Sequence, residues 1–144
     1  MAKVAFDRSA SARWEGSGKE GKGTLSTQSG ILKETSYSYK SRFVDGNIST
    51  NPEELIGAAH AGCFTMQLSF LLNEEGYTAD YLDTDVKVYF EDGTIPKIVL
   101  QLTGKVPDIK RDEFARIAKK AKEVCPVSKL LKAEIELVVN HEEQ

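Results

Sequence analysis

The first third of the chain alternates polar and apolar side chains in short stretches that glycines interrupt. Residues 3–14, 22–28 and 36–44 are rich in aromatic, β-branched and hydroxyl side chains. Such stretches, separated by glycine-containing breaks, are typical of half-buried strands joined by turns. We therefore expect an antiparallel meander of three strands, followed by a loop at residues 45–47 (Asp-Gly-Asn).

A long segment that is apolar on nearly every face follows this loop. It opens with Asn51-Pro52-Glu53-Glu54, a typical helix start in which Asn caps the first turn, Pro fits its first position and the acids face the positive end of the helix dipole. The helix is expected to run to about Glu75, where Gly76 predicts its end. A helix that is apolar all round must be covered all round.

The length of residues 55–72 would also allow a membrane span. However, the segment carries His60, Thr65, Gln67 and Ser69, and its flanks are acidic rather than basic. We interpret it as a buried helix and expect no membrane association. Small side chains at 57–62 permit close helix approach, so we expect a second copy of the chain to complete the cover in a symmetric homodimer. The alternative is that the chain's own sheet covers the helix.

The last sixty residues predict a hairpin, two helices and a final strand. Asp92-Gly93 is a strong hairpin signal between two strand-like stretches. A Lys-rich stretch with apolar residues at helical spacing predicts a surface helix, which Cys125-Pro126 ends and after which a short helix can begin. The predicted elements are strands at 84–91 and 94–106, helices at 112–124 and 126–131, and a strand at 133–140.

Composition restricts the protein class. With 144 residues, 28% of them charged and 40% hydrophobic, the chain fits one globular domain over residues 1–144. Nineteen basic against 22 acidic residues give a net charge of −3, so the surface offers no general cationic footprint for nucleic acid. Two cysteines are too few for a disulfide scaffold, and the opening MAKVAFDRSA has no apolar run of a signal peptide. We expect a cytoplasmic protein.

The two cysteines are the first candidates for chemistry. Cys63 lies about 18 Å beyond the helix start, so the helix dipole cannot lower its pKa and burial would raise it. A reactive Cys63 therefore needs a cation from elsewhere in the fold, and the alternative is an inert buried thiol. Cys125 precedes Pro126 at the expected start of a helix, where free N–H groups favour a thiolate. The alternative is a cysteine that only ends a helix.

A metal site is a third possibility. His60 and Cys63 share one helical face, and with Cys125 and an acid they could form a zinc site. Neither cysteine belongs to a close ligand pair, and a histidine among alanines is more often part of the core.

Two motifs far apart in the sequence each contain one cysteine. The first is TNPEELIGAAHAGCF at residues 50–64, and the second is Cys125-Pro126-Val127-Ser128, sixty-two positions after Cys63. Both closely resemble motifs of the osmotically inducible protein C and organic hydroperoxide resistance (OsmC/Ohr) family. Further matches are Trp14-Glu15-Gly16, Gly21-Lys22-Gly23, Ser41-Arg42-Phe43 and Leu131-Lys132-Ala133-Glu134-Ile135. The resemblance covers essentially the whole chain, and Ser41-Arg42-Phe43 favours the osmotically inducible branch.

The resemblance implies a thiol-dependent peroxidase that reduces organic hydroperoxides to alcohols. Its implied fold is α+β, an intertwined homodimer with antiparallel β-sheets packed around long central helices and with active sites at the subunit interface. The implied setting is the response to oxidative and osmotic stress. A non-catalytic regulatory or small-ligand-binding dimer with inert thiols is the alternative function, and a zinc-binding protein is another.

By the same resemblance, four residues form the active site. Cys63 would be the peroxidatic cysteine, Cys125 the resolving one, Glu53 the acid of the Asn-Pro-Glu motif and Arg42 the arginine that stabilises the thiolate. The resulting Cys63–Cys125 disulfide would be reduced by an external dithiol, for which a lipoyl-type dithiol is one candidate. No metal, haem or flavin cofactor is implied.

The position of Glu53 raises a geometric question. Ten residues separate it from Cys63, which is about 15 Å along one continuous helix. If both belong to one site, then either the helix breaks between them or Glu53 comes from the other subunit, and we favour the second. There Glu53 would pair with Arg42. The alternative is that Glu53 only complements the helix dipole.

Overall fold

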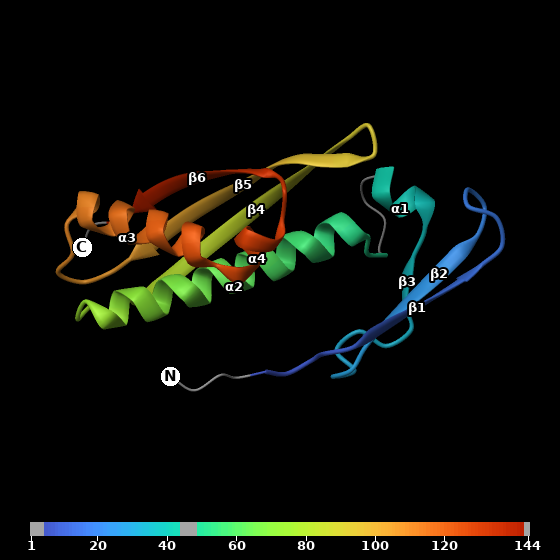
Figure 1. Cartoon of the computed structure of the whole chain (residues 1–144), viewed down its shortest axis with the longest axis horizontal. Coiled ribbons are helices and arrows are strands. Elements are labelled where there is room, and N and C mark those ends of the chain that lie inside the picture. Colours follow the sequence, from blue (N-terminus) through green and yellow to red (C-terminus); the bar gives the residue numbers. More distant parts are fainter. Residues whose placement is uncertain (1–4, 44–48, 143–144) are drawn as a thin grey trace. The chain divides into compact units, whose positions relative to one another are not determined.

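The computed structural model describes residues 5–43 and 49–142, with the backbone alone for Arg42 and Phe43. It divides into two compact units, one ending at Pro52 and the other beginning at Glu53. The elements in chain order are β1 (Ala10–Glu15), β2 (Lys22–Thr27), β3 (Thr35–Tyr37), α1 (Tyr39–Phe43), α2 (Pro52–Glu74), β4 (Tyr81–Glu91), β5 (Thr94–Lys105), α3 (Arg111–Val124), α4 (Pro126–Leu130) and β6 (Glu134–His141) (Figure 1). The prediction of one domain over the whole chain stays a prediction.

The first unit is built on the expected antiparallel meander, in the order β1-β2-β3. Trp14 pairs with Gly23, and Gly23 with Tyr37. Because Gly23 has no side chain, the two aromatic rings approach to 5.5 Å across it, and a Cβ there would lie 2.5 Å from Tyr37 and 2.6 Å from Trp14. The first strand begins at Ala10 among the described residues, later than expected.

The expected third strand over residues 36–44 is wrong beyond Tyr37, because residues 39–43 form helix α1. Ser38 and Ser41 explain the helix. The N–H of Ser41 donates to Ser38 Oγ (3.2 Å), and the N–H of Ser38 donates to Ser41 Oγ (2.9 Å). This reciprocal arrangement satisfies two free N–H groups at a helix start. The loop expected at residues 45–47 lies outside the described residues.

Helix α2 begins and ends close to where its local chemistry predicts. It starts at Pro52 and is continuous to Glu74. Gly76 then takes a positive φ of 89°, and the N–H groups of Tyr77 and Gly76 donate to the carbonyls of Leu72 (2.9 Å) and Asn73 (3.1 Å). Glycine at this position allows the left-handed turn that satisfies the last carbonyls of the helix.

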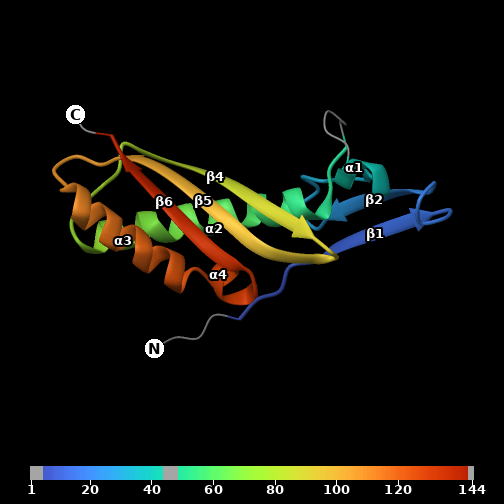
Figure 2. The ribbon, with the colours of Figure 1, turned by 90° about the horizontal axis from the view of Figure 1, so that it is seen from above.

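The sheet of the second unit has the order β4-β5-β6, with β5 between the other two strands (Figure 2). The β4–β5 hairpin turns at Asp92-Gly93 as predicted, both residues having positive φ. The expectation of purely antiparallel sheets is wrong for β6, which pairs parallel to β5. Helices α3 and α4 lie between these two strands in the chain, and such a crossover brings the next strand back in the same direction.

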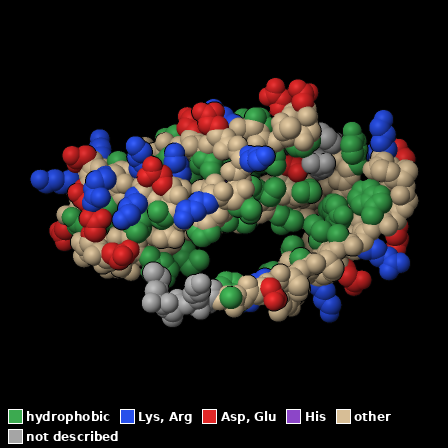
Figure 3. All heavy atoms as spheres, in the orientation of Figure 1, with side chains coloured by type: hydrophobic (Ala, Val, Ile, Leu, Met, Phe, Trp, Pro, Cys, Tyr) green, Lys and Arg blue, Asp and Glu red, His purple; other side chains and the backbone are tan. Residues whose placement is uncertain are grey.

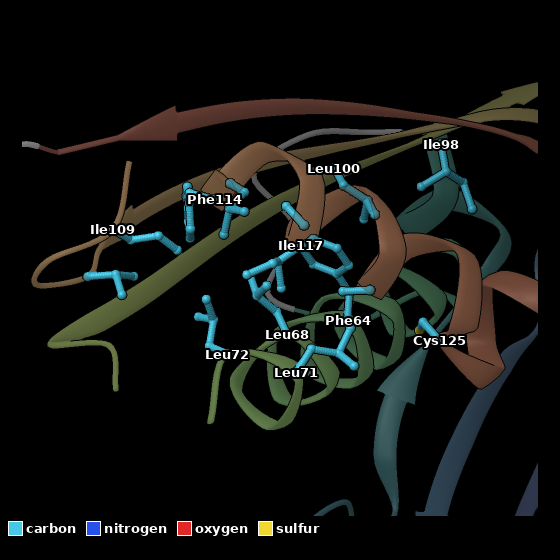
Figure 4. Close-up of a cluster of buried hydrophobic side chains, with 14 residues drawn as sticks. Phe64, Leu68, Leu71, Leu72, Ile98, Leu100, Ile109, Phe114, Ile117 and Cys125 are labelled. Atoms are coloured by element: carbon cyan, nitrogen blue, oxygen red, sulfur yellow. The ribbon is translucent and has the colours of Figure 1, made fainter. Parts of the chain in front are cut away.

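The core of the second unit lies between one face of this sheet and helices α2 and α3, which are on the same side of it (Figure 1). Figure 4 shows these side chains pointing toward one another, with Cys125 at the margin. Along β4 and β6 every second residue is exposed. The face of the unit seen in Figure 3 carries acidic and basic side chains mixed over α3 rather than a patch of one sign. The fully buried members of the core are Phe64, Leu68, Leu72, Ile98, Leu100, Leu102, Phe114, Ile117, Ala118, Ala121 and Cys125.

Within the second unit, helix α2 is covered on one face only. Phe64 and Leu68 are fully buried, whereas Met66 and Phe70 are 60% and 62% exposed. By length and composition the helix could cross a membrane, but its buried face belongs to the core that packs on the sheet, and we interpret it as a core helix. The sheet of the second unit therefore leaves an apolar stripe of α2 uncovered.

Candidate active site

The two cysteines, sixty-two positions apart in the sequence, lie side by side in the second unit. Cys63 is half-buried on α2, and Cys125 is fully buried at the junction of α3 and α4. Both thiols are free, and Cys125 Sγ donates to Cys63 Sγ at 3.0 Å. Pro126 creates the junction, because a residue before proline is disfavoured in the helical conformation. Cys125 is accordingly extended (φ −61°, ψ 122°) and is both the C-cap of α3 and the N-cap of α4. Two sulfurs at this separation can form a disulfide after a small rearrangement.

The surroundings of Cys63 act on its pKa in opposite directions. Burial raises the pKa of the Cys63 thiol above its ordinary value of 9.0, and the neighbouring Cys125 thiol adds to this rise. A hydrogen bond from the backbone N–H of Val127 lowers the same pKa. The sequence argument that a reactive Cys63 needs an added cation therefore applies to the folded chain.

The backbone N–H of Val127, at the start of α4, acts on Cys63 rather than on Cys125. We expected this helix start to act on Cys125, but the Cys125 side chain makes no capping hydrogen bond. The N–H of Val127, the second residue of α4, acts instead on Cys63. Sequence reasoning missed Val127, although the Cys-Pro-Val-Ser motif contains it.

His60 and Ser128 form a second link between the cysteine-bearing segments. His60 is fully buried, and its Nε2 lies 2.7 Å from Ser128 Oγ in a hydrogen bond. Its Nδ1 has no partner among the described residues. Burial lowers the pKa of His60 from its ordinary value of 6.5, so the ring is neutral at neutral pH. Sequence reasoning placed His60 in the core or in a zinc site and gave Ser128 no role.

The zinc alternative is not supported by this arrangement. Within the described part of the chain, no group of three His, Cys, Asp or Glu side chains is placed to hold a metal ion. The Nε2 atom of His60 is directed at Ser128 rather than at a site shared with Cys63 and Cys125.

Glu53 lies at the start of the helix that carries Cys63, about ten residues away from it, in the part of the chain that the structure describes. Glu53 is the second residue of α2 and is half-buried. Because α2 is continuous from Pro52 to Glu74, the alternative of a helix break between Glu53 and Cys63 is wrong, and the two remain about 15 Å apart along the axis. The backbone of Arg42 belongs to α1, and its side chain lies outside the described residues. Their roles stay predictions.

Comparison with known proteins places this site in a family. The family model for OsmC-like protein matches residues 45–140. Peroxiredoxin OsmC of Escherichia coli (strain K12) is 49% identical over 138 residues, which are 93% of this chain and 96% of the relative. Organic hydroperoxide resistance protein OhrB of Bacillus subtilis (strain 168) is 28% identical over 65% of this chain and 70% of its own length.

Solved structures agree on the fold. The crystal structure of an OsmC-like protein from Mycoplasma pneumoniae superposes with a TM-score of 0.77 at 12% identity, covering 97% of this chain and all of the other. That of OhrB from Bacillus subtilis gives a TM-score of 0.67 at 24% identity, covering 95% and 98%. These likenesses confirm the predicted α+β class. Together with the family-model match, which includes both cysteine motifs, and the identity to an OsmC protein over nearly the whole chain, they show that this protein belongs to the OsmC/Ohr family.

Proposed function

We propose that this protein is a thiol-dependent peroxidase that reduces organic hydroperoxides to alcohols with Cys63 and Cys125. The observation that carries the proposal is the 3.0 Å contact between a half-buried and a fully buried free thiol. The names of the relatives, a peroxiredoxin and organic hydroperoxide resistance proteins, support the same activity.

The difference in exposure supports Cys63 as the thiol that reacts with the peroxide and Cys125 as the one that resolves it. The Cys63 thiolate attacks the distal oxygen of ROOH, the O–O bond breaks, and the alkoxide takes a proton and leaves as the alcohol. Cys63 is then a sulfenic acid. The sulfur of Cys125 attacks it, water leaves and the Cys63–Cys125 disulfide forms. An external dithiol supplies the two electrons that restore both thiols, and a lipoyl-type dithiol suits this exchange.

The uncovered stripe of α2 and the pKa of Cys63 both favour a homodimer. Met66 and Phe70 are the kind of large apolar side chains that a second subunit covers. For Cys63 to be a thiolate at neutral pH, a nearby cation must offset the rise in pKa that burial causes. Arg42 would supply this positive charge, with its guanidinium held by a bidentate ion pair to Glu53 of the partner subunit. We place this dimer in the cytoplasm.

A peroxide-consumption assay tests the proposal. Purified wild-type protein is expected to consume an organic hydroperoxide repeatedly when a dithiol is present, whereas Cys63→Ser consumes none. Cys125→Ser is expected to consume about one equivalent rapidly and then to stop turning over, because its sulfenic acid has no resolving partner and any further equivalent only oxidises it to the sulfinic acid and beyond. Wild-type protein without turnover would favour the non-catalytic dimer. Equal loss of the first turnover in both variants would count against the assigned order.

A further inference from the structure

We propose that His60 and Ser128 form a positioning pair that holds the Cys125 turn against Cys63 and so determines how often the sulfenic acid is resolved before it is overoxidised. This inference rests on the proposed peroxidase function. It concerns two residues that do not touch the peroxide, and it is carried by their placement on the two cysteine-bearing segments.

The spacing of the four residues is the first observation. His60 precedes Cys63 by three positions on α2, and Ser128 follows Cys125 by three positions, on the first turn of α4. Helical residues three apart lie on the same face, one turn from each other. The hydrogen bond between His60 Nε2 and Ser128 Oγ (2.7 Å) therefore joins α2 to α4 about one turn away from the 3.0 Å contact of the sulfurs.

The weak packing of α4 is the second observation. This five-residue helix has no fully buried residue, and Leu130 at its end is 77% exposed. Val127 is only partly buried at the margin of the core. Apolar packing alone therefore holds α4 loosely, and a directional bond to a fully buried imidazole adds a specific constraint on where the turn sits.

The position of the proton on the His60 ring determines whether His60 is the donor or the acceptor in its hydrogen bond with Ser128. Its Nδ1 is buried without a partner among the described residues. Buried N–H groups without a partner are rarer than buried acceptors without one, so we assign the proton of the neutral ring to Nε2 rather than to Nδ1. The Nε2–H then donates to Ser128 Oγ, and His60 is a neutral donor dedicated to α4.

The chemical consequence follows from competition at Cys63. Its sulfenic acid either reacts with Cys125, releasing water, or with a second hydroperoxide, which oxidises it to a sulfinic acid and leaves as the alcohol. The first reaction is intramolecular and depends steeply on position, since a misplacement of about 1 Å can cost on the order of 100-fold in rate. Loosening the turn should therefore raise the sulfinic fraction, with a much smaller effect on the first step, which the turn influences through the Val127 N–H.

Matched variants separate this role from general stability. Ser128→Ala and His60→Leu remove the bond, whereas Ser128→Thr keeps the hydroxyl and His60→Gln keeps an N–H donor near the Nε2 position. Each protein is treated with excess cumene hydroperoxide without reductant, and intact mass spectrometry gives the ratio of sulfinic acid to disulfide. The ratio is read early in the reaction, when unfolded chains, whose ordinary thiols react slowly with peroxide, contribute little to it.

The expected result is about a tenfold rise of this ratio in Ser128→Ala and His60→Leu, with Ser128→Thr and His60→Gln near wild type. In a Cys125→Ser background, where resolution cannot occur, Ser128→Ala should change the rate of sulfenic acid formation far less than it changes this ratio. An unchanged ratio in both disruptive variants, or an equal slowing of sulfenic acid formation, would overturn the proposal. Failure of the proposed function is distinguishable, because wild-type protein would then form no disulfide.

Discussion

At the scale of single residues, Cys63 occupies surroundings that work against its proposed role. Burial and the nearby Cys125 raise its pKa, and among the described residues the Val127 N–H is the group that lowers it. A thiol with a pKa above 9.0 is largely protonated at neutral pH and reacts slowly with peroxide. If the protein is a peroxidase, a positive charge must reach Cys63 in the active assembly.

Removing the guanidinium of Arg42 tests the origin of that charge. In a Cys125→Ser background, the pH profile of Cys63 alkylation is expected to have its midpoint well below 9.0, because the cation is present and the neighbouring thiol is gone. Arg42→Ala should move the midpoint upward and slow alkylation at neutral pH by about tenfold or more. Arg13→Ala is the control, because the Arg13 side chain on β1 is exposed. Equal profiles with and without Arg42 would assign the cation to another residue.

The buried neutral state of His60 predicts an acid-sensitive fold. Because the pKa of His60 is lower in the folded chain than its ordinary 6.5, the unfolded chain binds the proton more tightly. The contribution of His60 to the free energy of unfolding is therefore fully present above about pH 6.5 and is lost as the pH falls, by at most about 1.4 kcal/mol per pH unit.

Chemical denaturation of the wild type and of His60→Gln over this pH range measures the effect. The difference in unfolding free energy between the two proteins should shrink as the pH falls below about 6.5. A difference that stays constant with pH would mean that His60 does not remain neutral when folded.

At the scale of elements, local chemistry determined what could be predicted. The ends of α2 follow from Asn51-Pro52 and Gly76, which act within their own turns. Helix α1 also depends on a local signal, the Ser38 and Ser41 pair, but the aromatic residues of this stretch are typical of a strand and favour the wrong element.

The pairing of distant elements could not be read from local patterns. The parallel register of β6 depends on how α3 packs back onto the sheet. The contacts of Cys63 with Cys125 and of His60 with Ser128 are likewise tertiary, and only the resemblance to a family indicated the first. The second had no local signal beyond the position of Ser128 in the Cys-Pro-Val-Ser motif.

The approach of α3 to the sheet explains a glycine inside β5. A Cβ at Gly104 would lie 2.5 Å from Phe114 and 3.0 Å from Leu82. The Phe114 side chain of α3 therefore occupies the space that a side chain at position 104 would need. Gly104→Ala is expected to lower the free energy of unfolding by about 1–3 kcal/mol, because fully buried Phe114 cannot move away freely. Gly18→Ala, where a Cβ meets no atom within 4 Å, is the control. Equal midpoints of denaturation for the two variants would contradict this account.

At the scale of the whole molecule, the uncovered face of α2 and the position of Glu53 lead to the same assembly. Exposed Met66 and Phe70 lie on the helix that carries Cys63, so a subunit covering them would also lie along the helix that bears the proposed nucleophile. Glu53 cannot reach the Cys63 of its own helix, which is continuous between them. A two-fold crossing of two such helices could place the start of one near the middle of the other.

A mixed dimer tests whether the two chains share their sites. A Glu53→Ala subunit is combined with a Cys63→Ser subunit, each inactive as a homodimer, and differently tagged heterodimers are isolated and assayed with an organic hydroperoxide and a dithiol. If Glu53 serves the partner's Cys63, one site carries both changes and the other carries neither, so about half of the wild-type activity per dimer returns. If each chain builds its own site, both sites carry one change and the heterodimer stays inactive. A Glu53→Ala homodimer with full activity would instead restrict Glu53 to the helix dipole, where its contribution is about 0.3–1 kcal/mol of stability.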